Sequence, residues 1–477
     1  MIPAFPWRAV TLATFATVVR PAGLHALAAQ ETHAALGDLL PVWTVAPFIL
    51  LLLSIAVLPL AVPHWWERNR NKAIVALTLG LVSAAYMVAT HGPLGVEKVE
   101  EASLDYLSFI ALLASLFVIS SGIYVKGSLA GSPLSNTALL GIGVVLANFI
   151  GTTGASMVLI RPLLRANERR LRKTHIVVFF IFAVANCGGM LTPLGDPPLF
   201  LGFLKGVPFE WTLRLWPQWL FVNAVLLVIF NFVDQNIFDR EERERPGSLL
   251  EAVLKHEPLG IVGWHNFLFL LCVILVVLGK GNGWGAGGGQ WSFGVQEGLM
   301  AALGVGAYLS TRAAIREANS FTFAPIVEVA VLFAGIFLTM IAPLQILNAR
   351  GDQLPLTEPW HFYWVSGTLS SFLDNAPTYL TFAATAAGRF GIGAEGSRYL
   401  ADFLALGPEA VKLLTAVACG SVMMGANTYI GNAPNFMVKA IAEEGGVRMP
   451  SFFGYMAWSG AVLIPTFILV TLVFFRG

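Results

Sequence analysis

Apolar stretches separated by short polar segments run through almost the whole chain from about residue 40. A helix that crosses a bilayer needs about 20 predominantly apolar residues, and many of these stretches come close to that length. The predicted crossings are 43–62, 73–90, 106–125, 176–204, 219–232, 265–278, 295–309, 323–347, 410–440 and 453–475. The pattern therefore predicts an all-α polytopic membrane protein.

Glycine and proline interrupt two of these crossings, 176–204 and 410–440. Proline removes a backbone N–H and clashes with the preceding turn, so each crossing should consist of two half-helices joined by unwound backbone. The interruptions also align, because Thr192, Gly195, Pro198 and Phe200 fall on Thr428, Gly431, Pro434 and Phe436. Broken crossings at corresponding places in two halves indicate a secondary transporter. Chance similarity between two Gly/Pro tracts is the alternative.

Two further apolar stretches are predicted to be re-entrant hairpins, at 136–164 and 361–387. The first contains Gly151 and Gly154 at its middle and has basic residues at both ends, which places both ends on one side of the membrane. A single long helix with a glycine kink is the alternative. The second is interrupted at Asp374 and Pro377, and it should enter from the opposite face.

Lysine and arginine concentrate on one side of this layout, which is therefore assigned to the cytoplasm. The predicted order is a leader at 1–30, a first repeat at 40–233, a charged cytoplasmic linker at 234–262 and a second repeat at 263–477. Each repeat makes five crossings and one hairpin, and an odd number of crossings inverts the second repeat. The leader resembles a cleavable signal peptide, with a retained amphipathic segment as the alternative. Both mature termini are then expected outside.

Composition excludes several other classes of protein. The 477 residues are 56% hydrophobic and 12% charged, with a net charge of +1 and no basic run interleaved with aromatic residues, so no nucleic-acid partner is expected. Cys187, Cys272 and Cys419 lack CxxC spacing, which predicts neither a disulfide nor a zinc site. A membrane-embedded enzyme is the alternative class. However, the sequence lacks HExxH, GxSxG and paired acidic motifs of the DDxxD type, so no enzymatic activity is predicted.

Three motifs resemble a known superfamily: Gly151-Thr-Thr-Gly-Ala-Ser-Met, Leu191-Thr-Pro-Leu-Gly-Asp-Pro-Pro-Leu-Phe-Leu and Asp374-Asn-Ala-Pro-Thr-Tyr-Leu. They are similar to motifs of the ion transporter superfamily of arsenite permeases, sodium–proton antiporters and citrate carriers. The similarity is greatest to bacterial proteins named sodium–proton antiporters or citrate transporters. It implies a homodimer in the bacterial inner membrane, with a scaffold domain and a domain that moves like an elevator. Citrate-type members carry Ser-Asn-Thr at hairpin tips, whereas Ser135-Asn136-Thr137 lies at the start of a hairpin here, so that role is not transferred.

Carboxylates at the predicted breaks are the candidate site. Ionisable side chains inside a membrane are costly and usually functional, and Asp196, Asp374 and Glu328 lie within predicted crossings or hairpins. Removal from water favours the protonated carboxyl, so a proton and a cation such as Na⁺ could compete for one group. We assign proton coupling to Asp196, Asp374 and Glu328, and a Na⁺ site to Asp196, Asp374 and Asn375. The full set of candidate ion-binding residues is Thr152, Thr153, Ser156, Asn186, Thr192, Asp196, Asp374, Asn375, Thr378, Asn427, Thr428 and Asn432.

Three alternatives stay open at this point. Asp196 and Asp374 precede proline-containing helix starts and could simply be N-caps, while Glu328 could be a cap or reach the membrane surface. Half-helix N-termini attract anions, which favours citrate or another carboxylate as substrate. Arsenite efflux is a third possibility. Two fixed carboxylates would repel a multivalent anion, so cation–proton antiport is the leading hypothesis, with Na⁺ and H⁺ as the transported or coupling ions and no cofactor.

Overall fold

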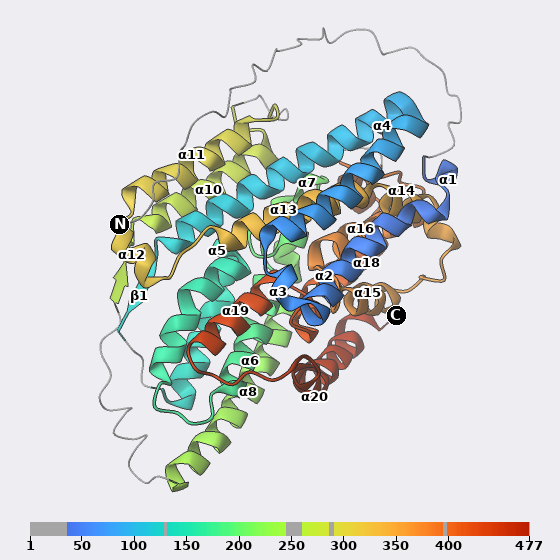
Figure 1. Ribbon diagram of the computed structural model, residues 1–477. Helices are drawn as coiled ribbons and strands as arrows, with labels where there is room; N and C mark the ends of the chain where they lie inside the picture. Colours follow the sequence, from blue (N-terminus) through green and yellow to red (C-terminus); the bar gives the residue numbers. More distant parts are fainter. Residues whose placement is uncertain (1–35, 128–130, 245–259, 286–290, 395–397, 477) are drawn as a thin grey trace. The chain divides into compact units, whose positions relative to one another are not determined.

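The computed structural model describes residues 36–127, 131–244, 260–285, 291–394 and 398–476 (Figure 1). The predicted leader at 1–30 and the linker segment 245–259 lie outside the described residues. Within them the chain is almost entirely helical. The sheet found there has two strands, β1 (Tyr124–Lys126) and β2 (Gly260–Val262), paired antiparallel.

The helices follow one another with short connections. Those up to residue 244 are α1 (Leu36–Leu39), η1 (Val42–Val45), α2 (Ala46–Ala61), α3 (Pro63–Trp66), α4 (Asn69–Ser121), α5 (Pro133–Ala166), α6 (Thr174–Ala183), η2 (Cys187–Gly189), α7 (Pro197–Leu204), η3 (Phe209–Leu215) and α8 (Trp216–Glu244). Those after residue 260 are α10 (Asn266–Asn282), α11 (Val295–Ser310), α12 (Ala313–Ala318), α13 (Ala324–Thr339), α14 (Ile341–Ala349), η4 (Gly351–Gln353), α15 (Pro359–Ser370), α16 (Asn375–Arg389), α17 (Tyr399–Ala405), α18 (Pro408–Met424), η5 (Gly425–Asn427), α19 (Ala433–Glu444), α20 (Phe452–Val470) and η6 (Thr471–Phe475).

Six helical segments of the described chain are long and apolar enough to cross a membrane, or seven if the bent pair α13 and α14 forms one crossing. They are Val42–Pro59, Asn69–Ser121, Pro133–Ala166, Phe209–Glu244, Pro408–Asn427 and Phe452–Phe475. The prediction of an all-α membrane protein is confirmed at this level. Several other predicted crossings are shorter helices or broken ones.

Helix α4 joins two predicted crossings, 73–90 and 106–125, into one element. Its backbone leaves the helical conformation at Gly92 (φ 53, ψ −127), directly before Pro93. The prediction left 91–105 outside both crossings, as a connecting loop rich in glutamate, but Glu97 and Glu100 in that stretch are helical. That prediction was wrong because glutamate is a good helix former and proline suits the first turn after a break.

Helix α5 turns back on itself at Gly151, whose backbone (φ 74, ψ 157) is accessible essentially only to glycine. A straight helix of 34 residues would separate its ends by about 50 Å. Instead, the Nδ2 of Asn136 near its start lies 3.0 Å from the Oδ1 of Asn167, directly after its end. The two halves of α5 therefore lie side by side.

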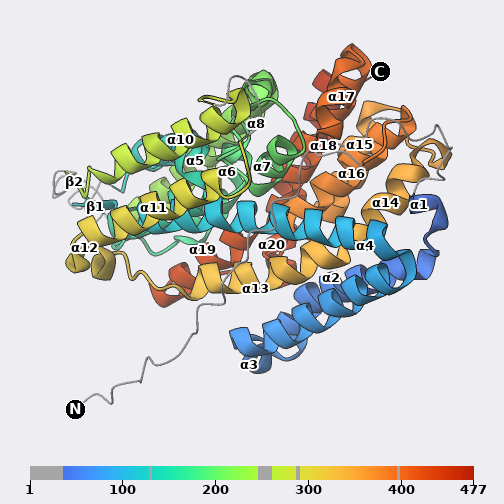
Figure 2. The ribbon, with the colours of Figure 1, turned by 90° about the horizontal axis from the view of Figure 1, so that it is seen from above.

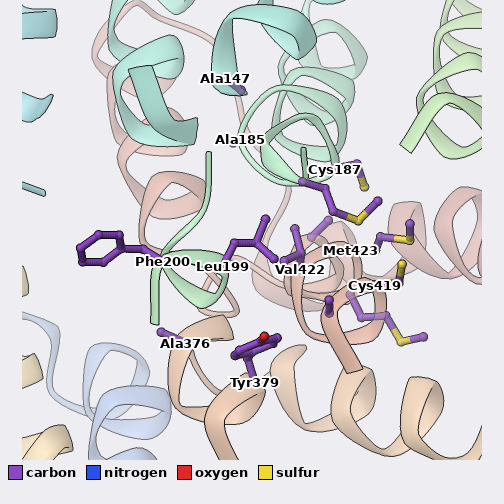
Figure 3. Close-up of a cluster of buried hydrophobic side chains, with 14 of the residues drawn as sticks. Ala147, Ala185, Cys187, Leu199, Phe200, Ala376, Tyr379, Cys419, Val422 and Met423 are labelled. Atoms are coloured by element: carbon purple, nitrogen blue, oxygen red, sulfur yellow. The ribbon is translucent and has the colours of Figure 1, made fainter. Parts of the chain in front are cut away.

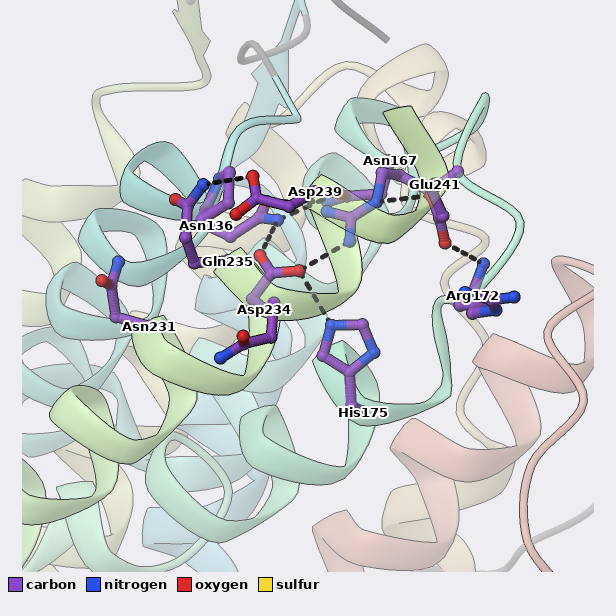
Figure 4. Close-up of polar contacts among 12 residues, drawn as sticks. Asn136, Asn167, Arg172, His175, Asn231, Asp234, Gln235, Asp239 and Glu241 are labelled. Atoms are coloured by element: carbon purple, nitrogen blue, oxygen red, sulfur yellow. Dashed lines mark hydrogen bonds and ion pairs between the residues drawn. The ribbon is translucent and has the colours of Figure 1, made fainter. Parts of the chain in front are cut away.

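A buried polar cluster fastens the open end of α5 to α8 (Figure 4). Asp234 of α8 accepts from Asn136 at 2.9 Å, from Arg170 at 2.8 Å and lies 2.8 Å from the His175 ring. Arg170 also donates to Glu241 at 3.1 Å. The charged side chains of this cluster are at most 3% exposed, so charge pairing and hydrogen bonds replace the lost water.

Both interrupted crossings contain unwound backbone. The first consists of α6, η2, an irregular stretch and α7, and the second of α18, η5, an irregular stretch and α19. Every residue of 176–183 in α6 is buried, as expected for a helix that is apolar on all sides. Leu199 and Phe200 of α7, Tyr379 of α16 and Val422 of α18 belong to one apolar cluster, which brings the two broken crossings into contact (Figure 3).

A second group of long helices packs outside the broken crossings. Helix α13 packs along α4, with α2 against both, while α10 and α11 pack against α4 as well (Figure 2). Helices α4 and α13 thereby border the interrupted segments and form one wall of the cavity described below.

Candidate functional site

Asp196 is the centre of the polar site, and its carboxylate is bound by side chains from three other elements. Oδ1 accepts from the Thr152 hydroxyl at 3.1 Å and from Nδ2 of Asn432 at 3.3 Å. Oδ2 accepts from Nδ2 of Asn375 at 2.9 Å. These donors come from the tip of α5, the start of α19 and the start of α16. The site is therefore assembled where both broken crossings and both predicted hairpins meet.

The two aspartates of the site have different roles. Asp196 is 1% exposed and holds the N-cap position of α7, but its carboxylate makes no capping hydrogen bond to that helix. Asp374 does cap α16, because its Oδ1 accepts from the backbone N–H of Ala376 at 3.1 Å. Asp374 lies within electrostatic range of Asp196 and also borders the cavity. The capping alternative thus describes Asp374 and does not describe Asp196.

No positive side chain neutralises Asp196 within the described part of the chain, where none of the ion pairs involves it. Its three partners are neutral amides and a hydroxyl. A carboxylate removed from water without a cationic partner is unfavourable, and binding of a proton or a metal cation relieves that penalty. Among the described residues, no three or more His, Cys, Asp or Glu side chains are arranged so that they could hold a metal ion.

A cavity of about 670 Å³ leads to this site. Its lining includes Thr152, Thr153, Gly195, Asp374 and Asn432, which we call the base of the cavity because they contact or flank Asp196. The rest of the lining is mainly apolar side chains of α2, α4, α13 and α19. Asp196 itself does not line the cavity, but Thr152 and Asn432, which bind its carboxylate, do.

Ion pairs lie in the cavity lining and after helix α7. Lys72 and Glu328 both line the cavity and pair with each other at 2.7 Å. Glu328 is thus paired with a lysine, and no hydrogen bond joins it to Asp196 among the described residues. A second set of ion pairs lies at the C-terminal end of α7, where Lys205 pairs with Glu101 at 2.7 Å and with Asp105 at 2.6 Å.

The remaining predicted residues mostly fasten the backbone. The Thr192 hydroxyl donates to the carbonyl of Asn148, and the Thr428 hydroxyl donates to that of Ser371. Each threonine thereby ties its interrupted crossing to the hairpin of the same half. Three further predicted residues make no hydrogen bond to Asp196. Thr378 donates to the Asp374 carbonyl, and Asn427 donates to the Ser371 hydroxyl. The Ser156 hydroxyl is buried and has no partner among the described residues.

Sequence reasoning missed two contributors to the site. Asn435, three residues after Asn432 on α19, is fully buried and accepts from Asn186 at 2.6 Å. Asn148 binds the backbone N–H of Leu191 at 2.8 Å and so holds the first break. Asn435 could have been found from its spacing, because a residue three positions after Asn432 lies on the same helix face.

The family of the chain follows from comparison with known proteins. One family model, described as "Putative citrate transport", matches residues 37–475. The chain belongs to this family. Among the curated proteins compared with it, none matches. The match covers nearly the whole described chain, so the resemblance to citrate-carrier-like members of the ion transporter superfamily is confirmed.

Membership in this transporter family, together with the apolar helices, identifies a multi-pass membrane protein that acts as a secondary transporter. It also favours transport over an enzymatic activity. In this family context the Asp196 site, with its cavity, is the candidate substrate or coupling-ion site.

Proposed function

We propose that the protein is a cation–proton antiporter, with Na⁺ as the leading cation, in which Asp196 binds the cation and the proton in turn. The observation that carries the proposal is a buried carboxylate with three neutral donors and no ion pair among the described residues, located behind the base of a cavity. Either a proton or Na⁺ neutralises this group. Since both cannot occupy it together, movement of one is linked to movement of the other.

Oxygen atoms near Asp196 suit a hard cation. The Thr152 hydroxyl donates to the Asp196 carboxylate, and the carbonyl oxygen of the adjacent Gly195 accepts from the Thr152 backbone N–H at 2.9 Å. Asp374 adds a second carboxylate at the cavity base, and we propose it as an additional cation or proton ligand. The Lys72 pair gives Glu328 a different role, in the cavity lining.

Citrate or a similar carboxylate is the second candidate, and the family description is the observation that favours it. Anion binding would depend on backbone N–H groups at helix starts. Here α7 begins with Pro197 and Pro198, which have no N–H, and Asp374 occupies the N–H of Ala376. The only basic side chain lining the described cavity, Lys72, is already paired with Glu328. These features favour the cation.

The larger arrangement is proposed on the same grounds. Two inverted repeats at 40–233 and 263–477, separated by the 234–262 linker, are supported by the equivalent roles of Thr192 and Thr428 at the two breaks. Elevator-like movement of the breaks and hairpins against a scaffold would carry the site across the membrane. A homodimer in the bacterial inner membrane, with both mature termini outside, completes the proposal.

Everted membrane vesicles provide the test. Chloride salts of Na⁺, Li⁺ and K⁺, and choline citrate, are added in turn while a dye reports the pH gradient. We expect Na⁺ or Li⁺ to dissipate the gradient and choline citrate to have no effect. A response to citrate alone would replace antiport with the second candidate.

Asp196→Asn should abolish this response, because an amide can neither release a proton nor supply a negative charge. Asp374→Asn is the matched variant, since asparagine also caps helices and the fold of α16 is retained. Any loss of activity in Asp374→Asn therefore reports on its charge. Antiport of normal rate in Asp196→Asn, with equal amounts of protein in the membrane, would refute the assignment.

A further inference from the structure

A chain of buried amides runs from Asp196 to Asn435. Nδ2 of Asn432 lies 3.3 Å from Asp196 and 3.2 Å from Oδ1 of Asn186. Nδ2 of Asn186 lies 2.6 Å from Oδ1 of Asn435. Asn186 and Asp196 belong to the first broken crossing, and Asn432 and Asn435 to the second. The chain therefore passes between the two crossings at each step.

Backbone carbonyls of the second break determine which way the Asn435 amide faces. Its Nδ2 donates to the carbonyls of Gly425 and Thr428, both at 2.9 Å. An amide oxygen in that place would face two carbonyl oxygens, so the NH₂ group must lie there. Only Oδ1 of Asn435 is then directed at Asn186.

The same argument fixes the next two amides. Asn186 must present its NH₂ to Asn435, and the Ile181 carbonyl accepts from that NH₂ at 2.8 Å. Its oxygen is left to accept from Asn432 at 3.2 Å, and the NH₂ of Asn432 lies 3.3 Å from Asp196 and 3.3 Å from the Ala185 carbonyl, which also accepts from it. Reversal of any of these amides would place like atoms against each other.

We propose that Asn435 is a positioning residue of the ion site, which acts through Asn186 and Asn432 to keep a hydrogen-bond donor directed at Asp196. This inference rests on the proposed role of Asp196 in ion binding. Asn435 and Asn186 are fully buried, and Asn432 is 3% exposed, so bulk water cannot replace a lost partner. A donor directed at a carboxylate stabilises the charged form and so favours cation binding over protonation.

The other titratable groups near Asp196 are Asp374, at the start of α16, and Cys187, in the first break. Among the described residues, no hydrogen bond joins the side chain of Asp374 or of Cys187 to Asn186, Asn432 or Asn435. A change at Asn435 should therefore reach Asp196 through the amides and leave these neighbours in place.

Asn435→Leu, of similar size, tests the proposal through the Na⁺ dependence of antiport. We expect the half-saturating Na⁺ concentration to rise about tenfold, with a smaller change in maximal rate, as for a loss of about 1.4 kcal/mol in binding. The matched control is Asn348→Leu. Asn348 is also buried and donates to two backbone carbonyls, those of Ala384 and Ile392, but has no bond to the amide chain.

A double-mutant cycle with Asn186→Leu separates positioning from general destabilisation. If Asn435 acts through Asn186, its replacement should add little to the effect of Asn186→Leu alone. Additive effects of the two replacements, or an equal effect of Asn348→Leu, would overturn the proposal. Asn435→Ser, which keeps one small donor and acceptor, serves the same cycle if the leucine variant does not insert.

A readout without transport distinguishes this proposal from the proposed function. Carbodiimides react with protonated carboxyls, and mass spectrometry of the Asp196 peptide gives the pH of half-maximal modification. In Asn435→Leu this midpoint should move upward by about one pH unit, while Asn348→Leu leaves it unchanged. A shift in a protein that shows no Na⁺ response would retain the positioning role and reject antiport. An unshifted midpoint would reject the positioning role whatever ion is transported.

Discussion

The Thr152 hydroxyl gives the sharpest test of a single contact at the site. It donates to Asp196 at 3.1 Å from the tip of α5, and both side chains are buried. A hydrogen bond to a charged group contributes about 1.5–3 kcal/mol. We expect Thr152→Val to raise the half-saturating Na⁺ concentration at least about tenfold in vesicle assays. Thr152→Ser retains the hydroxyl and should stay close to wild type, and a valine variant with normal Na⁺ dependence would contradict the contact's role.

Individual residues also show how far sequence alone could define the site. Glycine, proline and aspartate within apolar stretches were sufficient to identify the breaks and Asp196. They could not distinguish a ligand from a helix cap, because both uses favour a short polar residue before proline. Asp196 and Asp374 differ in what their side chains bind. The carboxylate of Asp374 caps its own helix, whereas that of Asp196 makes no capping bond and binds side chains of other elements. For the same reason Asn435, whose partners lie in both crossings, was not predicted.

Individual helices were predictable where local signals suffice. The break at Gly151 combines glycine with a conformation that other residues rarely adopt, and the end-to-end contact of Asn136 and Asn167 closes the turn. An exposed loop was predicted between the crossings 73–90 and 106–125 because the residues there are charged. This prediction was wrong, since both crossings and the stretch between them belong to α4. Glu101 instead remains helical and pairs with Lys205, a partner about 100 positions away that no local pattern reveals.

The polar cluster between α5 and α8 should be essential for the stability of the hairpin. Asp234 is completely buried, and Asp234→Leu leaves Arg170 without this partner in a site closed to water. Removal of one member of a buried ion pair costs about 3–5 kcal/mol. We therefore expect a marked fall in the midpoint of thermal unfolding in detergent.

The exposed pair between Arg172 and Glu244 is the matched control for that variant. It has similar geometry, with 2.7 Å between charged atoms, but both side chains are nearly half exposed. Glu244→Gln should change the unfolding free energy by less than about 1 kcal/mol. Equal unfolding midpoints for the two variants would show that burial of the cluster adds nothing to stability.

In the molecule as a whole, one short helix links the candidate site to a group of partly buried ion pairs. Helix α7 connects these features, because Asp196 directly precedes it and Lys205 directly follows it. Lys205 binds Glu101 and Asp105 of α4, which belongs to the group of long helices outside the breaks. The elevator-like movement proposed above would shift α7 relative to α4 and break these ion pairs. We therefore expect the pairs to stabilise the arrangement seen in this structure.

Lys205→Gln should consequently shift the population away from this arrangement. The substitution removes the ammonium group that pairs with Asp105, while Glu101 keeps its second partner, Lys98, at 3.0 Å. Loss of a contact made in only one of two arrangements shifts the population away from that arrangement. The accessibility of the cavity is measured through a cysteine that replaces Ile430, one of the lining residues. The partly exposed native thiol of Cys272 is first removed by Cys272→Ser. An impermeant thiol reagent added on the cavity side should label Ile430→Cys more slowly in the Lys205→Gln background. Arg172→Gln, which breaks an exposed pair instead, should leave the labelling rate unchanged. Equal rates in all three backgrounds would mean that the Lys205 pairs do not hold the cavity open.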